Sequence, residues 1–430
     1  MPLKLNSKSA GFEEAFKALL NQKRDEDRNV DMVAADILTD VRKRGDAALL
    51  DYTRKFDRLV LSDTTKLRVT AAEIKNAVTS CDATTLEALK VAAARIEDYH
   101  RRQLPEDQMY KDTAGVSLGY RWTAIENVGL YVPGGRATYP SSVLMNAIPA
   151  KVAGAKRLVM VVPMPDGIIN PMVLAAADLC GVNEIYRIGG AQAVGALAYG
   201  TETIAPVDKI VGPGNAYVAS AKKQVFGTVG IDMIAGPSEI LVVADGQNDP
   251  AWIAADLLSQ AEHDPVAQSI LITDDEDFAK AVEAAIESHL ENLNRAEIAR
   301  ASWQDYGAVI IVKDLEDAPS LVDQIAPEHL ELCVDNPESL AASIHHAGAI
   351  FLGRYSPEAI GDYVAGPNHV LPTSRTARFS SGLSTLDFVK RTSLMKLDAD
   401  SLHRIGPAAV ALAESEGLDA HALSVSIRLN

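Results

Sequence analysis

The sequence predicts an α/β protein with two doubly wound parallel sheets. From about residue 131 to 238, short apolar segments of strand length alternate with Ala-rich segments of helix length. A second series of the same kind runs from 239 to about 353. Such alternation is typical of βαβ units, in which helices cover both faces of a parallel sheet. Small helical segments at the two ends of the chain complete the expected fold class.

The chain before residue 116 is expected to be helical. Two apolar stripes at helical spacing predict two helices, Phe12, Phe16, Leu19 and Leu20 in the first and Val33, Ile37 and Val41 in the second. Gly45 ends the second helix, and another follows over 47–56. Thr70 and Glu73 have the spacing of a capping box before a short helix, and a longer helix is expected from about 84 to 102.

The expected strands are short apolar runs. Two extended segments over 116–131 come first, and the runs that follow them are RLVMVV (157–162), EIYRI (184–188), KIV (209–211), EILVVAD (239–245), QSILIT (268–273), AVIIV (308–312) and GAIFL (348–352). The abrupt change of pattern at 116–131 suggests that the first α/β unit is inserted into the second. The segment after about residue 381 has few strand signals and is too small to hold its own core, so it should pack elsewhere, for example on another subunit.

Composition excludes several classes of partner. Lys and Arg number 41 against 58 Asp and Glu, and the net charge of −17 would repel nucleic acid and anionic membranes. Three cysteines are too few for a disulfide framework. No apolar leader begins the chain, and no apolar run approaches the ~18 residues of a membrane span, so a cytoplasmic protein is expected.

Glycine loops follow three strands of the first series, at VPGG (132–135), IGGAQ (188–192) and VGPGN (211–215). Ligands bind outside the carboxyl ends of parallel strands. Each loop alone is explained better as an ordinary turn. The three together, with Tyr131, Gln192 and Asn215 as polar contacts, favour a nucleotide-binding cleft. None has the GxGxxG fingerprint, so the units are expected to be incomplete Rossmann-like sheets with an unusual cofactor pose.

Two proton-transfer groups stand side by side in QIAPEHL (324–330). Pro327 suits the first position of a helix, which would place Glu328 and His329 about 100° apart at a helix start. A carboxylate and an imidazole can both be tuned to transfer protons near neutral pH. The alternative is a helix start with two solvated polar residues.

A metal site is the third candidate. On a helix, Gln260 and His263 would share one face, and more distant ligands such as Asp362 and His421 would have to complete a zinc site. These spacings match no local zinc motif. On ligand chemistry alone Glu262 is a better candidate than Gln260, because amide oxygens bind zinc poorly. Asp362 could instead cap a helix.

Longer motifs in this chain resemble those of histidinol dehydrogenases. They occur in the family's order from about residue 30 to about 427, and they are YVPGG, GGAQAVGALAYGT, VGPGNAYV, AGPSEILVVAD, DLLSQAEHD, APEHLEL, IGDYVAGPNHVLPT and EGLDAH. Motifs of this length are highly specific when they occur together.

The resemblance implies an activity and a cofactor set. Enzymes of this family oxidise L-histidinol to L-histidinaldehyde and then to L-histidine, the last steps of histidine biosynthesis, with two NAD⁺ used at one site. The resemblance also implies one Zn²⁺ per subunit. It further implies a homodimer in which the C-terminal segment of one subunit completes the site of the other.

The resemblance assigns roles to particular residues. The catalytic pair is Glu328, which would activate water, and His329, which would be the general base. The remaining assignments are as follows: zinc ligands Gln260, His263, Asp362 and His421; substrate contacts Ser238, His369 and Glu416 besides His329 and the zinc ligands; NAD⁺ contacts Tyr131, Gln192 and Asn215. Without the resemblance, His369 would be an ordinary loop residue hydrogen-bonded to the backbone.

Four segments are expected on this basis. Residues 1–27 form an N-terminal helical segment, and 131–238 form the NAD-binding α/β domain. Residues 28–130 and 239–381 together form the α/β domain with the catalytic and most metal-binding residues. Residues 382–430 form the tail that completes the partner's site.

Two other functions remain as alternatives. One is a related NAD-dependent dehydrogenase that acts on another small alcohol, and the other is a non-catalytic nucleotide-binding protein. Glu416 and His369 argue against the first, because a substrate without an imidazole and an ammonium group would not need both. The complete acid–base and metal sets argue against the second.

Overall fold

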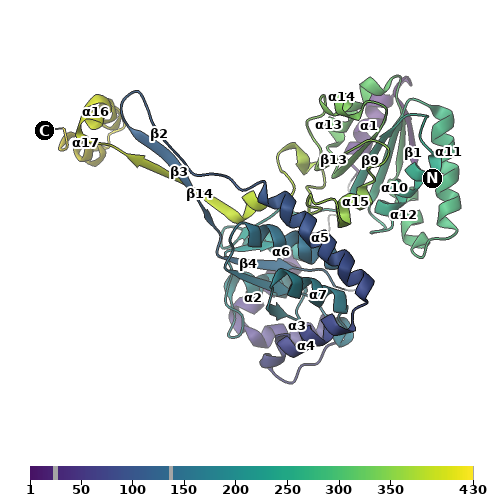
Figure 1. Ribbon diagram of the computed structural model, residues 1–430, viewed down its shortest axis with the longest axis horizontal. Coiled ribbons are helices and arrows are strands. Elements are labelled where there is room, and N and C mark those ends of the chain that lie inside the picture. The colour runs from purple at the N-terminus through teal and green to yellow at the C-terminus, as the bar shows by residue number, and fades with distance from the viewer. Residues whose placement is uncertain (23–27, 135–138, 430) are drawn as a thin grey trace.

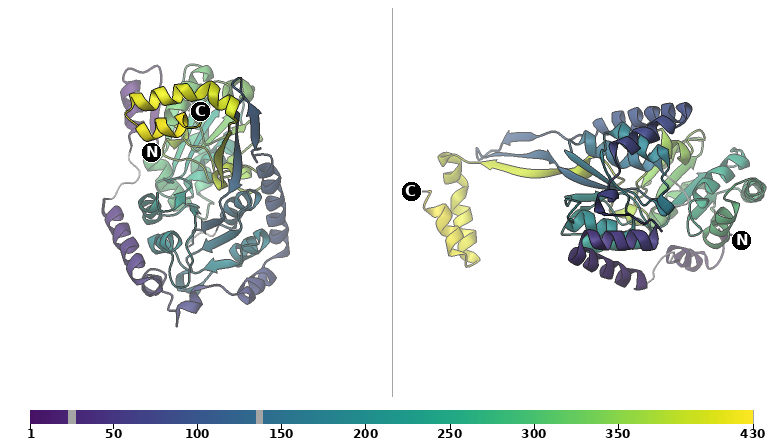
Figure 2. Two further views of the ribbon diagram at one scale, coloured as in Figure 1. Left: turned by 90° about the vertical axis from the view of Figure 1, so that its left-hand side faces the viewer. Right: turned by 90° about the horizontal axis from the view of Figure 1, so that it is seen from below.

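The computed structural model describes residues 1–22, 28–134 and 139–429. The body has two α/β lobes, each built on one parallel sheet, and an arm projects from the body (Figures 1 and 2). We call the lobes the six-stranded lobe and the five-stranded lobe after their sheets. The arm consists of residues 108–124 and 389–429.

The six-stranded lobe is built from both ends of the body's sequence. Its parallel strands lie in the order β1 (Leu3–Asn6), β11 (Ala308–Ile311), β10 (Gln268–Thr273), β9 (Glu239–Ala244), β12 (His329–Cys333) and β13 (Ala349–Leu352). One face is covered by α1 (Phe12–Leu20), α13 (Ala318–Ile325) and α14 (Pro337–Ala341). The other face is covered by α10 (Pro250–Ala261), α11 (Glu276–Leu290) and α12 (Ala296–Tyr306), and α15 (Glu358–Tyr363) packs on α10.

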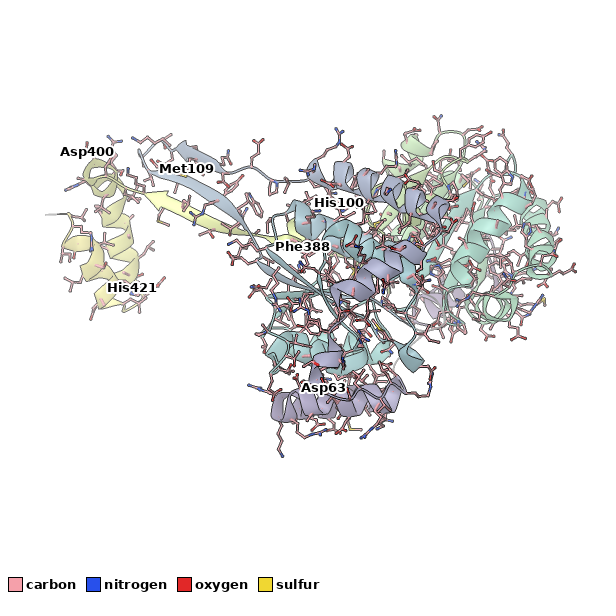
Figure 3. The ribbon with its side chains drawn as sticks, turned by 60° about the horizontal axis from the view of Figure 1, so that its bottom comes forward. Asp63, His100, Met109, Phe388, Asp400 and His421 are labelled. Carbon is pink, nitrogen blue, oxygen red and sulfur yellow. The ribbon has the colours of Figure 1, made fainter. Side chains whose placement is uncertain are left out.

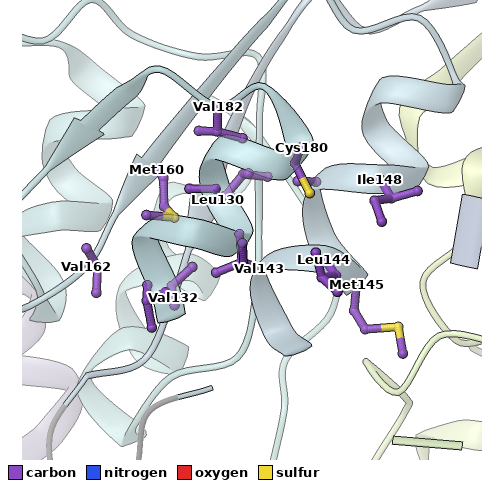
Figure 4. Close-up of a cluster of buried hydrophobic side chains, with 14 of the residues drawn as sticks. Leu130, Val132, Val143, Leu144, Met145, Ile148, Met160, Val162, Cys180 and Val182 are labelled. Carbon is purple, nitrogen blue, oxygen red and sulfur yellow. The ribbon is translucent and has the colours of Figure 1, made fainter. Parts of the chain in front are cut away.

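The five-stranded lobe has parallel strands in the order β6 (Glu184–Tyr186), β5 (Arg157–Val161), β4 (Asn127–Tyr131), β7 (Lys209–Val211) and β8 (Gly230–Ile231). One face is covered by α4 (Ala71–Ser80), α5 (Ala83–Arg101), α6 (Pro140–Val152) and α7 (Pro171–Cys180). Figure 4 shows part of the apolar core on this face. The other face is covered by α2 (Arg28–Arg44), α3 (Asp46–Phe56), α8 (Gly190–Tyr199) and α9 (Ala216–Val225).

The arm is an antiparallel ribbon with two helices at its tip. The strands β14 (Val389–Lys396), β3 (Ser117–Ala124) and β2 (Gln108–Lys111) lie in that order, and α16 (Ala399–Ser415) and α17 (Asp419–Ser426) pack against each other beyond them. Apolar side chains at the tip lie in solvent, with Leu412 65% and Leu423 59% exposed. Short 3₁₀ turns complete the elements, η1 (Thr64–Leu67), η2 (Pro165–Gly167), η3 (Leu315–Asp317), η4 (Thr376–Arg378) and η5 (Thr385–Phe388).

The predicted fold class is confirmed, because both sheets are parallel and each has helices on both faces. Each apolar run that predicts a strand contains one, and Thr70 caps α4 through the predicted box with Glu73. Among the described residues no helix combines the length and apolar character that crossing a membrane requires.

The helix predicted at Pro327 is wrong. The helix α13 ends before it, Ala326 adopts a left-handed conformation with φ 48°, and His329 begins the strand β12. Proline often follows a helix C-cap because it cannot continue the helix, and here it marks the end of one helix rather than the start of another. Glu328 and His329 therefore stand at the amino end of a strand.

The sequence analysis missed five strands, β1, β2, β8, β12 and β14, and the two at the ends of the chain are instructive. The N-terminal segment carries β1 in addition to its helix, at an edge of the six-stranded sheet. Residues 382–430 carry β14, whose sequence VKRTSLMK has few buried positions. Apolar patterns reveal a strand when one face is buried, and in this chain β14 lies in an arm with both faces largely in solvent.

The packing of the N-terminal helices also differs from expectation. Residues 28–101 were joined to 239–381 in the sequence analysis, but α2 to α5 pack on the five-stranded sheet. An apolar stripe shows which side of a helix is buried and not which sheet buries it. Where the chain divides into independently folding domains stays a prediction.

One buried ion pair fixes the loop after β7. The side chains of Lys222 and Asp232 pair with each other and are 3% and 1% exposed. Lys222 Nζ donates to the carbonyl oxygen of Gly212 at 2.9 Å, and Asp232 Oδ2 accepts from the Gly212 N–H at 2.7 Å. Gly212 has φ 113°, and a Cβ there would lie 2.1 Å from the carbonyl oxygen of Tyr131. The pair thus holds a glycine that no other residue can replace without a clash.

Lys222→Met should lower the midpoint of thermal unfolding clearly. Removing one partner of a buried ion pair costs about 3–5 kcal/mol, since the other charge is left buried and unpaired. The exposed neighbour Lys223 gives a matched control, and Lys223→Met should unfold at the wild-type temperature. Equal midpoints for the two variants, measured by calorimetry, would show that the pair adds nothing to stability.

Candidate active site

A pocket of about 900 Å³ lies between the two lobes. Its wall in the five-stranded lobe is formed by residues at the carboxyl ends of β4 to β7, including Tyr131, Pro163 and Gly190. Its wall in the six-stranded lobe lies at the amino ends of β9 and β12, at Ser238 and His329. The five-stranded sheet therefore offers the edge at which α/β proteins bind ligands, and the six-stranded sheet offers the opposite edge.

The pocket brings together all but two of the residues expected at the site. It is lined by Tyr131, Gln192, Asn215, Ser238, Gln260, His263, Glu328, His329, Asp362 and His369. Glu416 and His421 are absent from it, because both are exposed residues of the arm tip, where Glu416 follows α16 and His421 lies in α17. Figure 3 shows His421 far from the body of the same chain. The roles assigned to these residues from the sequence stay predictions.

His329 is oriented by the neighbouring strand. Its Nδ1 lies 2.9 Å from the backbone carbonyl oxygen of Glu239, the first residue of β9. A carbonyl oxygen only accepts hydrogen bonds, so the ring proton sits on Nδ1 and the lone pair sits on Nε2. Nε2 has no hydrogen-bond partner among the described residues. His329 is thus held in the tautomer that a general base needs.

Glu328 is held by the same residue of β9. Its Oε2 accepts the Glu239 N–H at 2.9 Å and lies 3.7 Å from His329 Nδ1. The side chain is 8% exposed, and burial raises its pKa well above the usual range of a glutamate. Once ionised, such a carboxylate is a stronger base than an exposed one.

Asp362 stands at the centre of the polar side of the pocket. Its Oδ1 lies 3.5 Å from His369 Nδ1 and 3.9 Å from His329 Nε2. Burial alone would raise the pKa of Asp362, but the hydrogen bond from His369 and the nearby His329 and His263 lower it below the usual range. The carboxylate is therefore ionised at neutral pH and can bind a cation.

Gln260 and His263 come from the end of α10 and the turn after it. The Gln260 amide lies 3.2 Å from His329 Nδ1, and its Oε1 is buried with no hydrogen-bond partner. Burial lowers the pKa of His263, which keeps its imidazole neutral and able to bind a metal ion.

Glu358 is a member of this cluster that the sequence analysis missed. Single ligand atoms of His329, Glu358 and Asp362 all lie within 4.8 Å of one another. Glu358 is 2% exposed, and burial raises its pKa to about 8. The signal in the sequence was the i, i+4 spacing of Glu358 and Asp362, which places both carboxyl groups on one face of α15.

The three glycine loops line the pocket in the five-stranded lobe. The hydroxyl of Tyr131 accepts the Gly190 N–H at 3.0 Å, and Asn215 caps α9 through the Val218 N–H at 3.1 Å. Gln192 is 1% exposed, and its Oε1 has no hydrogen-bond partner. Tyr131 ends β4 and Asn215 follows β7, and the strand order of this sheet reverses between these two strands. Gly135 of the first loop lies outside the described residues.

Comparison with known proteins gives the family. The family model for histidinol dehydrogenase matches residues 20–429. Histidinol dehydrogenase of Rhodospirillum rubrum is 66% identical, with 100% of this chain and 99% of the relative covered, and that of Agrobacterium fabrum is 64% identical over the same shares. The crystal structure of histidinol dehydrogenase from Elizabethkingia anophelis matches with a TM-score of 0.94 at 38% identity, and it covers 100% of this chain and 98% of that one. This chain therefore belongs to the histidinol dehydrogenase family of oxidoreductase enzymes.

Proposed function

We propose that this chain oxidises L-histidinol through L-histidinaldehyde to L-histidine, with two NAD⁺ as hydride acceptors and a bound Zn²⁺. The observation that carries the proposal is the pocket between the lobes. One wall of this pocket carries His329, in the tautomer that a general base needs, and the buried Glu328. The other wall carries glycine loops of the kind that bind nucleotides. The proposed compartment is the cytoplasm, where histidine biosynthesis would supply the substrate.

NAD⁺ is proposed to bind at the carboxyl ends of the five-stranded sheet. The reversal of strand order between β4 and β7 forms a crevice of the kind that binds dinucleotides. Tyr131, Gln192 and Asn215 stand at this crevice. The buried Gln192 Oε1 has no partner among the described residues, so a donor on the bound cofactor would satisfy it.

The donor set in the other wall fits zinc. Gln260, His263 and Asp362 line one part of the pocket with a neutral imidazole, an ionised carboxylate and an amide oxygen that has no partner. Zinc sites of enzymes commonly use three protein ligands or more, drawn from such nitrogen and oxygen groups. When bound, the ion would act as a template that fixes the imidazole and amino nitrogens of the substrate.

His329 is proposed to act in both oxidations. Hydride transfer from the alcohol requires loss of the hydroxyl proton, which His329 Nε2 can accept while Nδ1–H stays bonded to Glu239. The aldehyde must then add water to form a hydrate. Glu328, as a buried carboxylate, can remove a proton from that water, and His329 can deprotonate the hydrate for the second hydride transfer.

A homodimer is proposed because the pocket of one chain lacks two of the residues expected to line it, Glu416 and His421. Glu416 and His421 are exposed at the arm tip, which carries solvent-exposed Leu412 and Leu423. An arm of this kind, with few contacts to its own body, is suited to reach a second copy. We propose that each tip supplies His421 as a zinc ligand and Glu416 as a substrate contact to the partner's pocket.

The stoichiometry of NADH formation tests the proposed reaction. Two NADH should form per L-histidinol consumed, and chelation with EDTA should abolish the reaction until Zn²⁺ is added back. Spectrophotometry at 340 nm with limiting histidinol gives the ratio. One NADH per histidinol would refute the double oxidation. No NADH from folded, zinc-loaded protein would point to the related dehydrogenases that act on other small alcohols.

His329→Ala should lower kcat by about 10²–10⁴-fold, because the general base is lost. Zinc content, measured by atomic absorption, should stay at one per subunit, since His329 is not among the proposed ligands. His345→Ala is the control, because this histidine has an exposed side chain outside the pocket. Near-normal kcat in His329→Ala would remove this residue from the mechanism.

Mixing two inactive variants tests the shared site. In a heterodimer of His421→Ala and His329→Ala chains, one pocket keeps both histidines if the tip reaches across the dimer. Activity should then return to about a quarter of the wild-type value after random re-association. If each pocket is completed within one chain, proven heterodimers would show no recovery.

A further inference from the structure

Asp57 is a pocket residue to which the mechanism gives no role. It follows α3, which ends at Phe56, and it lines the part of the pocket that lies in the five-stranded lobe. Its backbone is fixed at both ends, since its N–H donates to Thr53 O at 2.9 Å and its carbonyl accepts from Asp166 N at 2.7 Å. The side chain is therefore presented from a rigid position.

One oxygen of the Asp57 carboxyl group is buried without a hydrogen-bond partner among the described residues. The residue is 7% exposed, and its Oδ2 has no hydrogen-bond partner among the described residues. The adjacent Arg58 is paired with Asp166, whose Oδ1 lies 2.7 Å from Arg58 Nε, and both side chains are mostly exposed. Burial raises the pKa of Asp57 to about 6, so the group still ionises at neutral pH. A buried acceptor of this kind is costly unless a ligand supplies donors.

The surroundings favour a sugar as that ligand. The other acidic residues that line the pocket, Asp264, Glu328 and Asp362, lie in the six-stranded lobe. The walls also include Ile37, Pro163 and Gly190. Apolar walls suit the flat face of a nucleoside, and a carboxylate accepts two vicinal hydroxyl groups well. In many NAD-specific enzymes an acidic residue accepts the 2′-hydroxyl of the adenosine ribose. Here Asp57 is placed on a helix end outside the sheet, and no acidic residue stands in the glycine loops.

We propose that Asp57 accepts hydrogen bonds from the ribose hydroxyls of the adenosine half of NAD⁺ and thereby excludes NADP⁺. This inference rests on the proposed use of NAD⁺. The hydride end of the cofactor must lie beside His329 in the six-stranded lobe, so the adenosine half extends into the five-stranded lobe. The 2′-phosphate of NADP⁺ would meet the Asp57 charge and would also lack the hydroxyl donor. The exposed Lys55 also lines this pocket, and its Nζ lies 5.1 Å from the centre of the Phe56 ring.

The test combines one variant with one altered cofactor. Wild-type protein should bind NAD⁺ about 10- to 100-fold more tightly than NAD⁺ that lacks the adenosine 2′-hydroxyl, because a hydrogen bond to a charged group is lost. Asp57→Ala should bind NAD⁺ and the 2′-deoxy analogue with the same weakened affinity. The ratio of its kcat/KM for NAD⁺ to its kcat/KM for NADP⁺ should be at least tenfold lower than in the wild-type protein. At saturating NAD⁺, kcat should stay within about twofold of wild type, because the reacting groups are untouched.

Controls separate this proposal from a folding defect. Asp51→Ala, on the same helix and outside the pocket, should behave as wild type in every measurement. Asp57→Asn keeps the side-chain volume and serves if the alanine variant does not fold. The proposal would be overturned if an Asp57 variant still bound NAD⁺ more tightly than its 2′-deoxy analogue by the same factor as the wild-type protein.

Calorimetry tests the role of Asp57 in NAD⁺ binding separately from the proposed oxidation of L-histidinol. Titration with NAD⁺ and its 2′-deoxy analogue needs no turnover, so the role of Asp57 is decided even if L-histidinol is not oxidised. Failure of the wild-type protein to oxidise L-histidinol would refute the proposed function alone. Failure of the wild-type protein to bind NAD⁺ would overturn both.

Discussion

The pairing of two parallel strands controls the geometry of the candidate site. Glu239 begins β9, and its backbone N–H and carbonyl bind the side chains of Glu328 and His329 at the start of β12. The register of the two strands, His329 beside Ile240, sets these contacts. Backbone groups cannot change rotamer, so they fix the position of both side chains and the tautomer of the imidazole more firmly than another side chain could. The acid–base pair is thus an extension of the sheet's own hydrogen-bond pattern.

The two lobes contribute different chemistry because they present opposite sheet edges. The carboxyl ends of the five-stranded sheet give backbone loops and a reversal of strand order, which suit a dinucleotide. The amino ends of β9 and β12, with α10 and α15, give buried carboxyl groups and imidazoles that suit proton transfer and metal binding. Neither edge alone contains both sets, so the position of one lobe relative to the other decides whether the proposed hydride acceptor and the proposed base can meet.

Local pattern predicted most of the fold, and contacts between distant segments account for what it missed. The apolar runs predicted strands, and the glycine loops at their ends line one wall of the pocket. Pro327 was misread because the same residue suits a helix start and the end of another helix, and only the preceding Ala326 conformation decides between them. The sequence analysis missed Glu358 and Asp57 because only their burial by distant segments distinguishes them from other acidic residues. The proposed homodimer would bring the arm tip to a second chain, and no pattern within one sequence displays such a contact.

The left-handed backbone at Ala326 has a consequence for rigidity. This residue has φ 48° and is fully buried, in a conformation that costs an alanine roughly 1 kcal/mol and a glycine little. An alanine at this position buries a methyl group, which a glycine would lack. The chain thus accepts some conformational strain two residues before Glu328. Backbone strain of this kind persists where the surrounding structure fixes the conformation, and here the chain that follows is fixed by the hydrogen bonds of Glu328 and His329 to Glu239.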